Sequence, residues 1–215
     1  MDKDESLVAA FSDERHSARL RVFSPAEIAD DRFVSWGELA GRAGYVLHPG
    51  STWREMSDRI GPGESSKYHP ASGGCDEISL ETLLHILTGA LPDLRASTEV
   101  TFAMWPGYAG EVENVESVRV FDFTAPLPFG RFGGLAVVQA PLDWLLTFGS
   151  DRPGRPHMPI YVWPQDGTFL ISCPIYSNSL FISADEELAW KLEESALDVV
   201  RLDSHSPLNC HDDLD

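Results

Sequence analysis

The alternation of apolar and polar residues is clearest between residues 160 and 197. Phe169, Ile171 and Cys173 recur at every second position, so they would share one face of a strand. The residues just before them, Pro-Gln-Asp-Gly, favour a turn, so a hairpin is expected here. The pattern predicts strands at 160–163, 168–173 and 179–182, with a turn at 164–167.

A helix is predicted directly after these strands. Ser183 stands three residues before Glu186, and the two side chains of such a capping box bind backbone N–H groups that the first helical turn leaves free. An apolar stripe at helical spacing follows, made of Ala184, Leu188, Leu192 and Ala196. We therefore expect this helix to begin after Ser183.

Elsewhere in the chain, segments with the two-residue period of a strand alternate with segments that have the apolar spacing of a helix. Ser35 precedes an apolar stripe that ends at Gly44, and Ser79 precedes a stripe of leucines that ends at Pro92. Both serines are expected to cap helices. Further strands are predicted at 19–23, 99–105, 117–123, 135–139 and 199–202, and a further short helix at 142–148.

The order of these elements indicates the fold class. Strands and short helices follow one another without regular strand–helix–strand units, which favours an α+β fold with a mainly antiparallel sheet of about five to seven strands and about three or four short helices packed on it. The Gly-, Pro- and Ser-rich residues 61–74 predict a long loop. We expect one domain at 19–203, an acidic, weakly patterned lead-in at 1–18 and a loose polar tail at 204–215.

Charge narrows the range of partners. The chain has 16 Lys and Arg residues against 34 Asp and Glu residues, a formal net charge of −18. Proteins that bind nucleic acids or anionic membranes need clustered cations to neutralise phosphates, so neither partner is expected. A basic protein fits this charge better, because opposite charges speed the encounter of two proteins.

The remaining composition predicts a cytoplasmic, soluble protein. No apolar run approaches the roughly 20 residues of a membrane span, and the acidic N-terminus does not look like a signal peptide. Cys75, Cys173 and Cys210 are odd in number and widely spaced, so no disulfide framework is expected.

Three segments of this chain look like parts of a known pattern. They are residues 34–40 (VSWGELA), residues 101–108 (TFAMWPGY), and residues 162–169 (VWPQDGTF) followed by the strand and helix at 180–192. In order and spacing, over residues 20–205, they resemble an uncharacterised family of small cytoplasmic proteins from actinomycete-type bacteria. Two departures are Val162, where the family has a bulkier residue, and the loop at 61–74, which the family lacks. The resemblance implies a single-domain fold and supplies no catalytic residue.

No metal site, cofactor or catalytic residue is expected. The chain lacks the phosphate-binding loop, the zinc-helix motif, paired cysteines and the nucleophile elbow. His69, Cys75 and His85 have the chemistry of zinc ligands, but two lie in or next to the predicted loop and His85 lies on the polar side of a helix. The acidic residues after Cys75 disfavour a thiolate nucleophile.

Trp190 is the first candidate binding residue. It lies off the apolar stripe of its helix, near Glu186 and Glu194. A tryptophan on a charged face is typical of a protein interface. The alternative is that another segment of the chain covers it.

A second candidate is a set of aromatic and polar residues at the ends of predicted strands. Its members are Trp105, Tyr108, Trp163, Asp166 and Tyr176. Aromatic faces with a few polar groups can bind a small ligand. The alternative is ordinary packing, with Asp166 stabilising its own turn.

Two functions follow as hypotheses. The first is a non-enzymatic protein-interaction domain, regulatory or immunity-like, that binds another protein through an acidic surface and Trp190. The second is a small-molecule-binding domain, or a hydrolase, with an aromatic pocket at the strand ends. Neither the oligomeric state nor the identity of a partner follows from the sequence.

Overall fold

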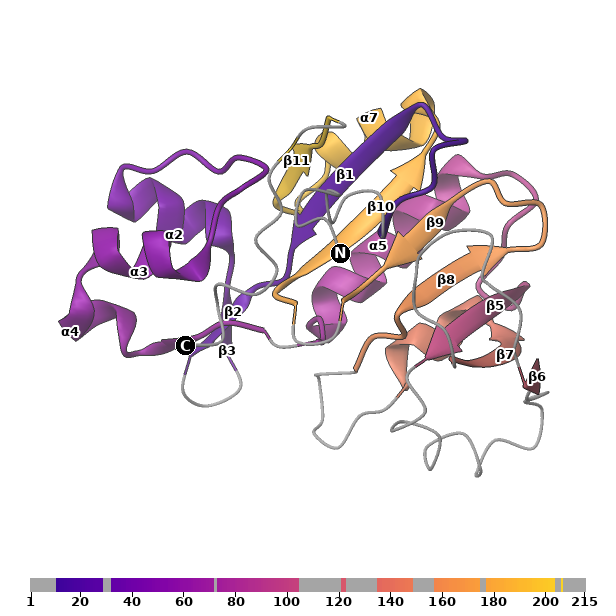
Figure 1. Ribbon diagram of the computed structural model, residues 1–215, viewed down its shortest axis with the longest axis horizontal. Coiled ribbons are helices and arrows are strands. Elements are labelled where there is room, and N and C mark those ends of the chain that lie inside the picture. The colour runs from indigo at the N-terminus through magenta and orange to yellow at the C-terminus, as the bar shows by residue number, and fades with distance from the viewer. Residues whose placement is uncertain are drawn as a thin grey trace, which may run out of the picture.

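The computed structural model describes residues 11–28, 32–71, 73–104, 121–122, 135–148, 157–174, 177–203 and 206 (Figure 1), and of residues 121–122 only the backbone. Two antiparallel sheets and their helices make up the fold in these ranges. The predicted α+β class with a mainly antiparallel sheet is therefore confirmed.

The larger sheet has seven strands and the two-residue β6, in the order β11-β1-β10-β9-β8-β5-β7-β6. Its strands are β1 (Ala18–Phe23), β5 (Glu99–Met104), β6 (Phe121–Asp122), β7 (Ala136–Pro141), β8 (Tyr161–Pro164), β9 (Leu170–Ser172), β10 (Ser179–Ala184) and β11 (Val199–Arg201). All neighbouring strands are antiparallel. The first described strand, β1, thus lies between β10 and β11 from the other end of the described chain.

Most of the predicted strands are present. The expected strands at 19–23, 135–139, 160–163, 168–173, 179–182 and 199–202 correspond to β1, β7, β8, β9, β10 and β11. The expected strand at 99–105 corresponds to β5, although Trp105 lies outside the described residues. Of the strand expected at 117–123, only β6 is described.

Helices cover one face of the larger sheet. They are α5 (Glu77–Ala90), α7 (Glu186–Glu193) and the 3-10 helix η2 (Leu142–Leu146) (Figure 1). The leucine stripe of α5 and Leu188, Ala189 and Leu192 of α7 are packed against this face in the main hydrophobic core. Of the stripe predicted for α7, Ala184 belongs to β10, and Ala196 follows the helix and is exposed, so that part of the prediction is wrong. Phe169, Ile171 and Cys173 point into the same core, as their alternation predicts.

The opposite face of the larger sheet contacts the segment that precedes β1. Phe11 is buried there, with its ring stacked on Tyr161 at 6.1 Å and on Phe181 at 6.4 Å between centroids. The Ser172 hydroxyl donates a hydrogen bond of 2.6 Å to the Phe11 carbonyl. The backbone N–H of Asp13 donates to the Ser183 hydroxyl at 3.1 Å. Residues 11–13 are therefore packed, although their sequence shows no period.

A smaller sheet and three short helices lie beside the β1 side of the larger sheet (Figure 1). The sheet consists of β2 (Ala26–Ile28), β3 (Arg32–Val34) and β4 (Tyr68–His69). The helices are α2 (Trp36–Ala43), α3 (Trp53–Ile60) and α4 (Pro62–Ser65). Trp36 and Phe23 pack in their common core, with 4.8 Å between ring centroids. The sequence pattern predicted only α2 of this group.

The prediction of a long loop at 61–74 is wrong. Helix α4 and strand β4 both lie within it, and Gly74 forms a bridge with His157. The glycines and prolines of this segment are typical of a loop, but Pro62 occupies the first turn of α4, where proline is favoured. Strand β4 forms because it pairs with the distant strand β2.

Two predicted helix caps are also wrong. Asp185, not Ser183, caps α7, and its carboxylate accepts a hydrogen bond of 2.8 Å from the Leu188 N–H. Ser183 belongs to β10, where it pairs with Arg19. Asp76, not Ser79, caps α5 in the same way. The cap Ser35 and the end of α2 at the left-handed Gly44 are confirmed.

Two glycines of α2 provide a matched pair of substitutions. A Cβ at Gly37 would meet the carboxylate of Asp198, which accepts a 3.0 Å hydrogen bond from the Gly37 N–H, whereas a Cβ at Gly41 would meet nothing within 4 Å. We expect Gly41→Ala to raise the free energy of unfolding by about 0.5–1 kcal/mol, because alanine favours helix. Gly37→Ala should lower it by about 1–2 kcal/mol, because the carboxylate must leave the helix N-terminus.

Urea unfolding of the two variants and of the parent measures this difference. Equal changes in the two variants would show that the Asp198 contact contributes nothing to stability.

None of the helices in the described ranges is both long and apolar enough to cross a membrane.

Candidate functional site

Helix α7 presents a large apolar side chain to solvent. Trp190 is 55% exposed, although Leu188, Ala189 and Leu192 of the same helix are buried. The difference arises because α7 packs on the sheet with one stripe only, and Trp190 lies off that stripe. The described parts of the chain therefore leave Trp190 uncovered, as the first binding hypothesis requires.

Four carboxylates lie next to Trp190 on the helix surface, because residues three and four positions apart are neighbours there. They belong to Glu186, Glu187, Glu193 and Glu194. Arg201 of β11 bridges two of them, with 2.6 Å from its Nη1 to Glu186 Oε2 and 2.8 Å from its Nη2 to Glu193 Oε2. The guanidinium thereby lowers the pKa of the Glu193 carboxyl, and the two carboxylates raise the pKa of Arg201.

The other flank of Trp190 is arranged differently. Glu187 forms a salt bridge with Lys191, 2.8 Å between Oε1 and Nζ. Glu194 follows the last helical residue, and within the described part of the chain its carboxylate makes no salt bridge. Sequence reasoning identified Glu186 and Glu194 near Trp190 but missed Glu187, Glu193 and Arg201. The predicted strand at 199–202, next to this helix in the chain, was the available signal for Arg201.

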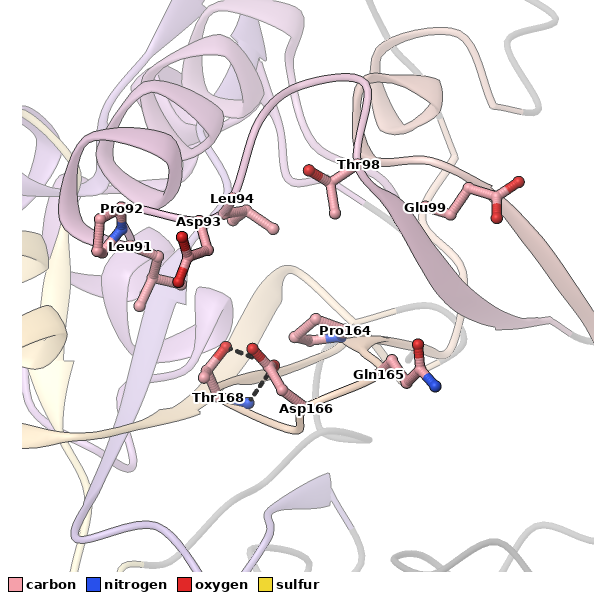
Figure 2. A pocket seen from close by; sticks show the side chains of 10 residues that line it. All are labelled: Leu91, Pro92, Asp93, Leu94, Thr98, Glu99, Pro164, Gln165, Asp166 and Thr168. Atoms are coloured by element: carbon pink, nitrogen blue, oxygen red, sulfur yellow. Dashed lines mark hydrogen bonds between the residues drawn. The ribbon is translucent and has the colours of Figure 1, made fainter.

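A cavity of about 370 Å³ lies elsewhere, between three segments. Figure 2 shows the segment after α5, the start of β5 and the turn between β8 and β9 around it. Its lining residues are Leu91, Pro92, Asp93, Leu94, Thr98, Glu99, Pro164, Gln165, Asp166 and Thr168. Three carboxylates and no basic side chain thus line this cavity. Pockets of this size commonly accept small ligands.

Asp166 lines the cavity and also stabilises its own turn. Its Oδ1 accepts hydrogen bonds of 3.0 Å from both the N–H and the hydroxyl of Thr168 (Figure 2). Arg95 follows the lining residues 91–94 in the sequence, but its guanidinium donates to the carbonyl oxygens of Pro92 and Leu94 and it is not part of the lining.

The predicted aromatic set is only partly described. Trp163 packs against the buried residues on the Phe11 face of the larger sheet and does not line the cavity. Of the set, Asp166 alone is among the lining residues given above. Trp105, Tyr108 and Tyr176 lie outside the described residues.

The candidate zinc and cysteine chemistry can be placed in part. Burial and the Asp76 charge raise the pKa of the Cys75 thiol to about 12, so a thiolate is disfavoured at neutral pH. His69 and His85 are exposed, whereas Cys75 and Cys173 are buried. Among the described residues, no group of three or more His, Cys, Asp and Glu side chains could hold a metal ion.

No protein-family model matches this chain, and no curated protein or solved structure is significantly similar to it.

Proposed function

We propose that this chain is a protein-interaction domain that binds its partner through the exposed face of α7 around Trp190. The exposure of Trp190 is the observation that carries the proposal. Tryptophan buries a large apolar area when it docks and is enriched among the residues that dominate binding energy. Such a face suits a regulatory or immunity-like protein, which acts by binding another protein.

The surrounding charges support the same proposal. The chain carries a net charge of −18, and Glu186, Glu187, Glu193 and Glu194 surround Trp190. Complementary charge mainly increases the rate of association and its sensitivity to salt, while the buried aromatic residue supplies affinity. A basic partner is therefore proposed, and its binding should weaken as the salt concentration rises.

A substitution at Trp190 tests the proposal. In affinity capture from the lysate of the source cell, Trp190→Glu should reduce the yield of a stoichiometric partner at least about tenfold, because it replaces the aromatic anchor with a charge. Ile78→Glu is the matched control, since Ile78 is 72% exposed on α5 and also apolar. Quantitative mass spectrometry at low and high salt measures both variants.

Retention of every partner by Trp190→Glu, with the fold unchanged by circular dichroism, would contradict the proposal. An equal loss with Ile78→Glu would show that α7 is not the specific surface.

The second candidate function is small-molecule binding or hydrolysis, and one observation favours it. Asp166, predicted as a ligand-binding residue, lines the cavity of about 370 Å³ between α5, β5 and the β8–β9 turn. If no partner is captured in either salt condition, this cavity becomes the favoured site.

A further inference from the structure

We propose that the group that docks on Trp190 is an arginine side chain of the partner, stacked on the indole and paired with Glu194. This inference rests on the proposed function, because it specifies the chemistry of the partner at the same face. Three features of the described residues support it: the unequal pairing of the carboxylates, the end of α7, and the exposed indole.

The carboxylates on the two flanks of Trp190 are not equivalent. Glu186 and Glu193 are two helical turns apart, lie on the same side, and share Arg201. Glu187 and Glu194 lie on the other side, where Lys191 pairs with Glu187. Four carboxylates against two cations leave the face negative, with Glu194 as the carboxylate that no described cation compensates. An incoming cation is therefore attracted to the Glu194 side of the indole.

The position of Glu194 in the helix strengthens this attraction. Glu194 is the C-cap of α7, where the helix dipole is negative and carboxylates are disfavoured. A cation docked there interacts favourably with the carboxylate and with the last backbone carbonyls together. Glu193 lies at the same helix end but is already compensated by Arg201.

Trp190 favours a flat cation next to this carboxylate. The face of an indole attracts cations through its quadrupole, and tryptophan is the best of the aromatic residues in this role. A guanidinium is planar, stacks on aromatic faces and can bind a carboxylate with two parallel hydrogen bonds, whereas an ammonium is strongly hydrated. An arginine side chain can therefore stack on Trp190 and bind the Glu194 carboxylate at the same time, and a lysine side chain is less suited to both interactions.

NMR with short peptides tests the inference directly. Three blocked glycine peptides serve as probes, with a single arginine, lysine or citrulline at the centre, since citrulline has the shape of arginine without its charge. The Trp190 indole N–H resonance is identified by its loss in Trp190→Phe. We expect the arginine peptide to shift this resonance and to bind at least about threefold more tightly than the lysine peptide. The difference in affinity between the arginine and citrulline peptides should be larger still.

Charge variants separate the local carboxylate from the overall charge. Glu194→Gln should weaken binding of the arginine peptide about threefold, as expected for an exposed ion pair. Glu81→Gln removes the same charge from an exposed position on α5 and should leave the affinity unchanged. Equal effects of the two variants would show that only the net charge of the protein matters, and would overturn the inference.

The remaining outcomes distinguish this inference from the proposed function. If Trp190→Glu loses the captured partner but the arginine and citrulline peptides shift Trp190 equally, the protein interaction stands and the arginine assignment falls. If sedimentation shows self-association that Trp190→Glu abolishes, a second copy of the chain occupies the face and the arginine assignment also falls. If the arginine peptide binds as expected but Trp190→Glu retains every partner, the proposed function falls.

Discussion

Arg21→Met is expected to lower the free energy of unfolding by about 3–5 kcal/mol, because it leaves several acceptors without their donor and each such loss costs about 1–3 kcal/mol. Arg21 is buried on β1, on the Phe11 side of the larger sheet. Its Nη1 donates to the carbonyl oxygens of Pro49 and Ser51 at 2.7 and 2.9 Å. Arg21 also donates to Ser179 Oγ at 2.9 Å and to Asn178 Oδ1 at 3.1 Å.

The large cost has two physical causes. Methionine fills part of the space but donates no hydrogen bond, so acceptors in the loop before α3 and at the start of β10 lose their donor at buried and half-buried positions. Arg21 also connects the segment at Pro49 and Ser51 to the larger sheet, and its guanidinium lies 4.3 Å from the centre of the Phe23 ring. The variant should therefore loosen the contact between the smaller and larger sheets.

Urea unfolding followed by circular dichroism measures this prediction. Arg54→Met is the control, because Arg54 is exposed on α3, and surface substitutions of this kind change stability by about 0.5 kcal/mol or less. Arg21→Lys should recover only part of the loss, since one ammonium cannot reproduce the fork of the guanidinium. Similar stability of the Arg21 and Arg54 variants would rule out a role for Arg21 in joining the two sheets.

Phe11→Ala is expected to lower the free energy of unfolding by about 3–5 kcal/mol, as for other buried phenylalanines replaced by alanine. The Phe11 ring is 3% exposed and packs on both Tyr161 and Phe181. Its loss would leave a cavity on the second face of the sheet and weaken the attachment of residues 11–13. Thermal and urea unfolding measure the effect.

Ile78→Ala is the control for Phe11→Ala, because Ile78 is exposed and its truncation removes little packing. Hydrogen exchange provides a second readout, since Phe11→Ala should increase exchange at the Asp13 N–H, which donates to Ser183. Unchanged exchange and stability would mean that the segment before β1 is not needed to close this face.

The candidate site was accessible to sequence reasoning as far as it depends on one helix. Trp190 departs from the apolar stripe of α7, and this departure is visible in the residues themselves. Glu186 and Glu194 follow from helical spacing. Arg201 could not be assigned to them, because its contact requires β11 to pair with β1 beside α7. The cavity with Asp166 likewise needs three segments to meet.

The two wrong caps show a similar limit. Ser183 and Asp185 both have side chains that cap helices, so local chemistry alone does not choose between them. The pairing of Ser183 with Arg19 extends β10 and moves the helix start to Asp185. The position of the helix cap therefore depends on Arg19, which lies more than a hundred positions away in the sequence.

The sequence by itself determined the α+β class, most strands of the larger sheet, the buried face of α5 and the burial of Leu188 and Leu192 in α7. It did so because the periods of strands and helices are local properties that burial on one side imposes on each segment. The tertiary structure alone decided the packing of Phe11 on Tyr161 and Phe181, the hydrogen bonds of Arg21 and the pairing of Arg201 with two glutamates. These contacts join residues from different segments, and their formation depends on strand order, which no local pattern specifies.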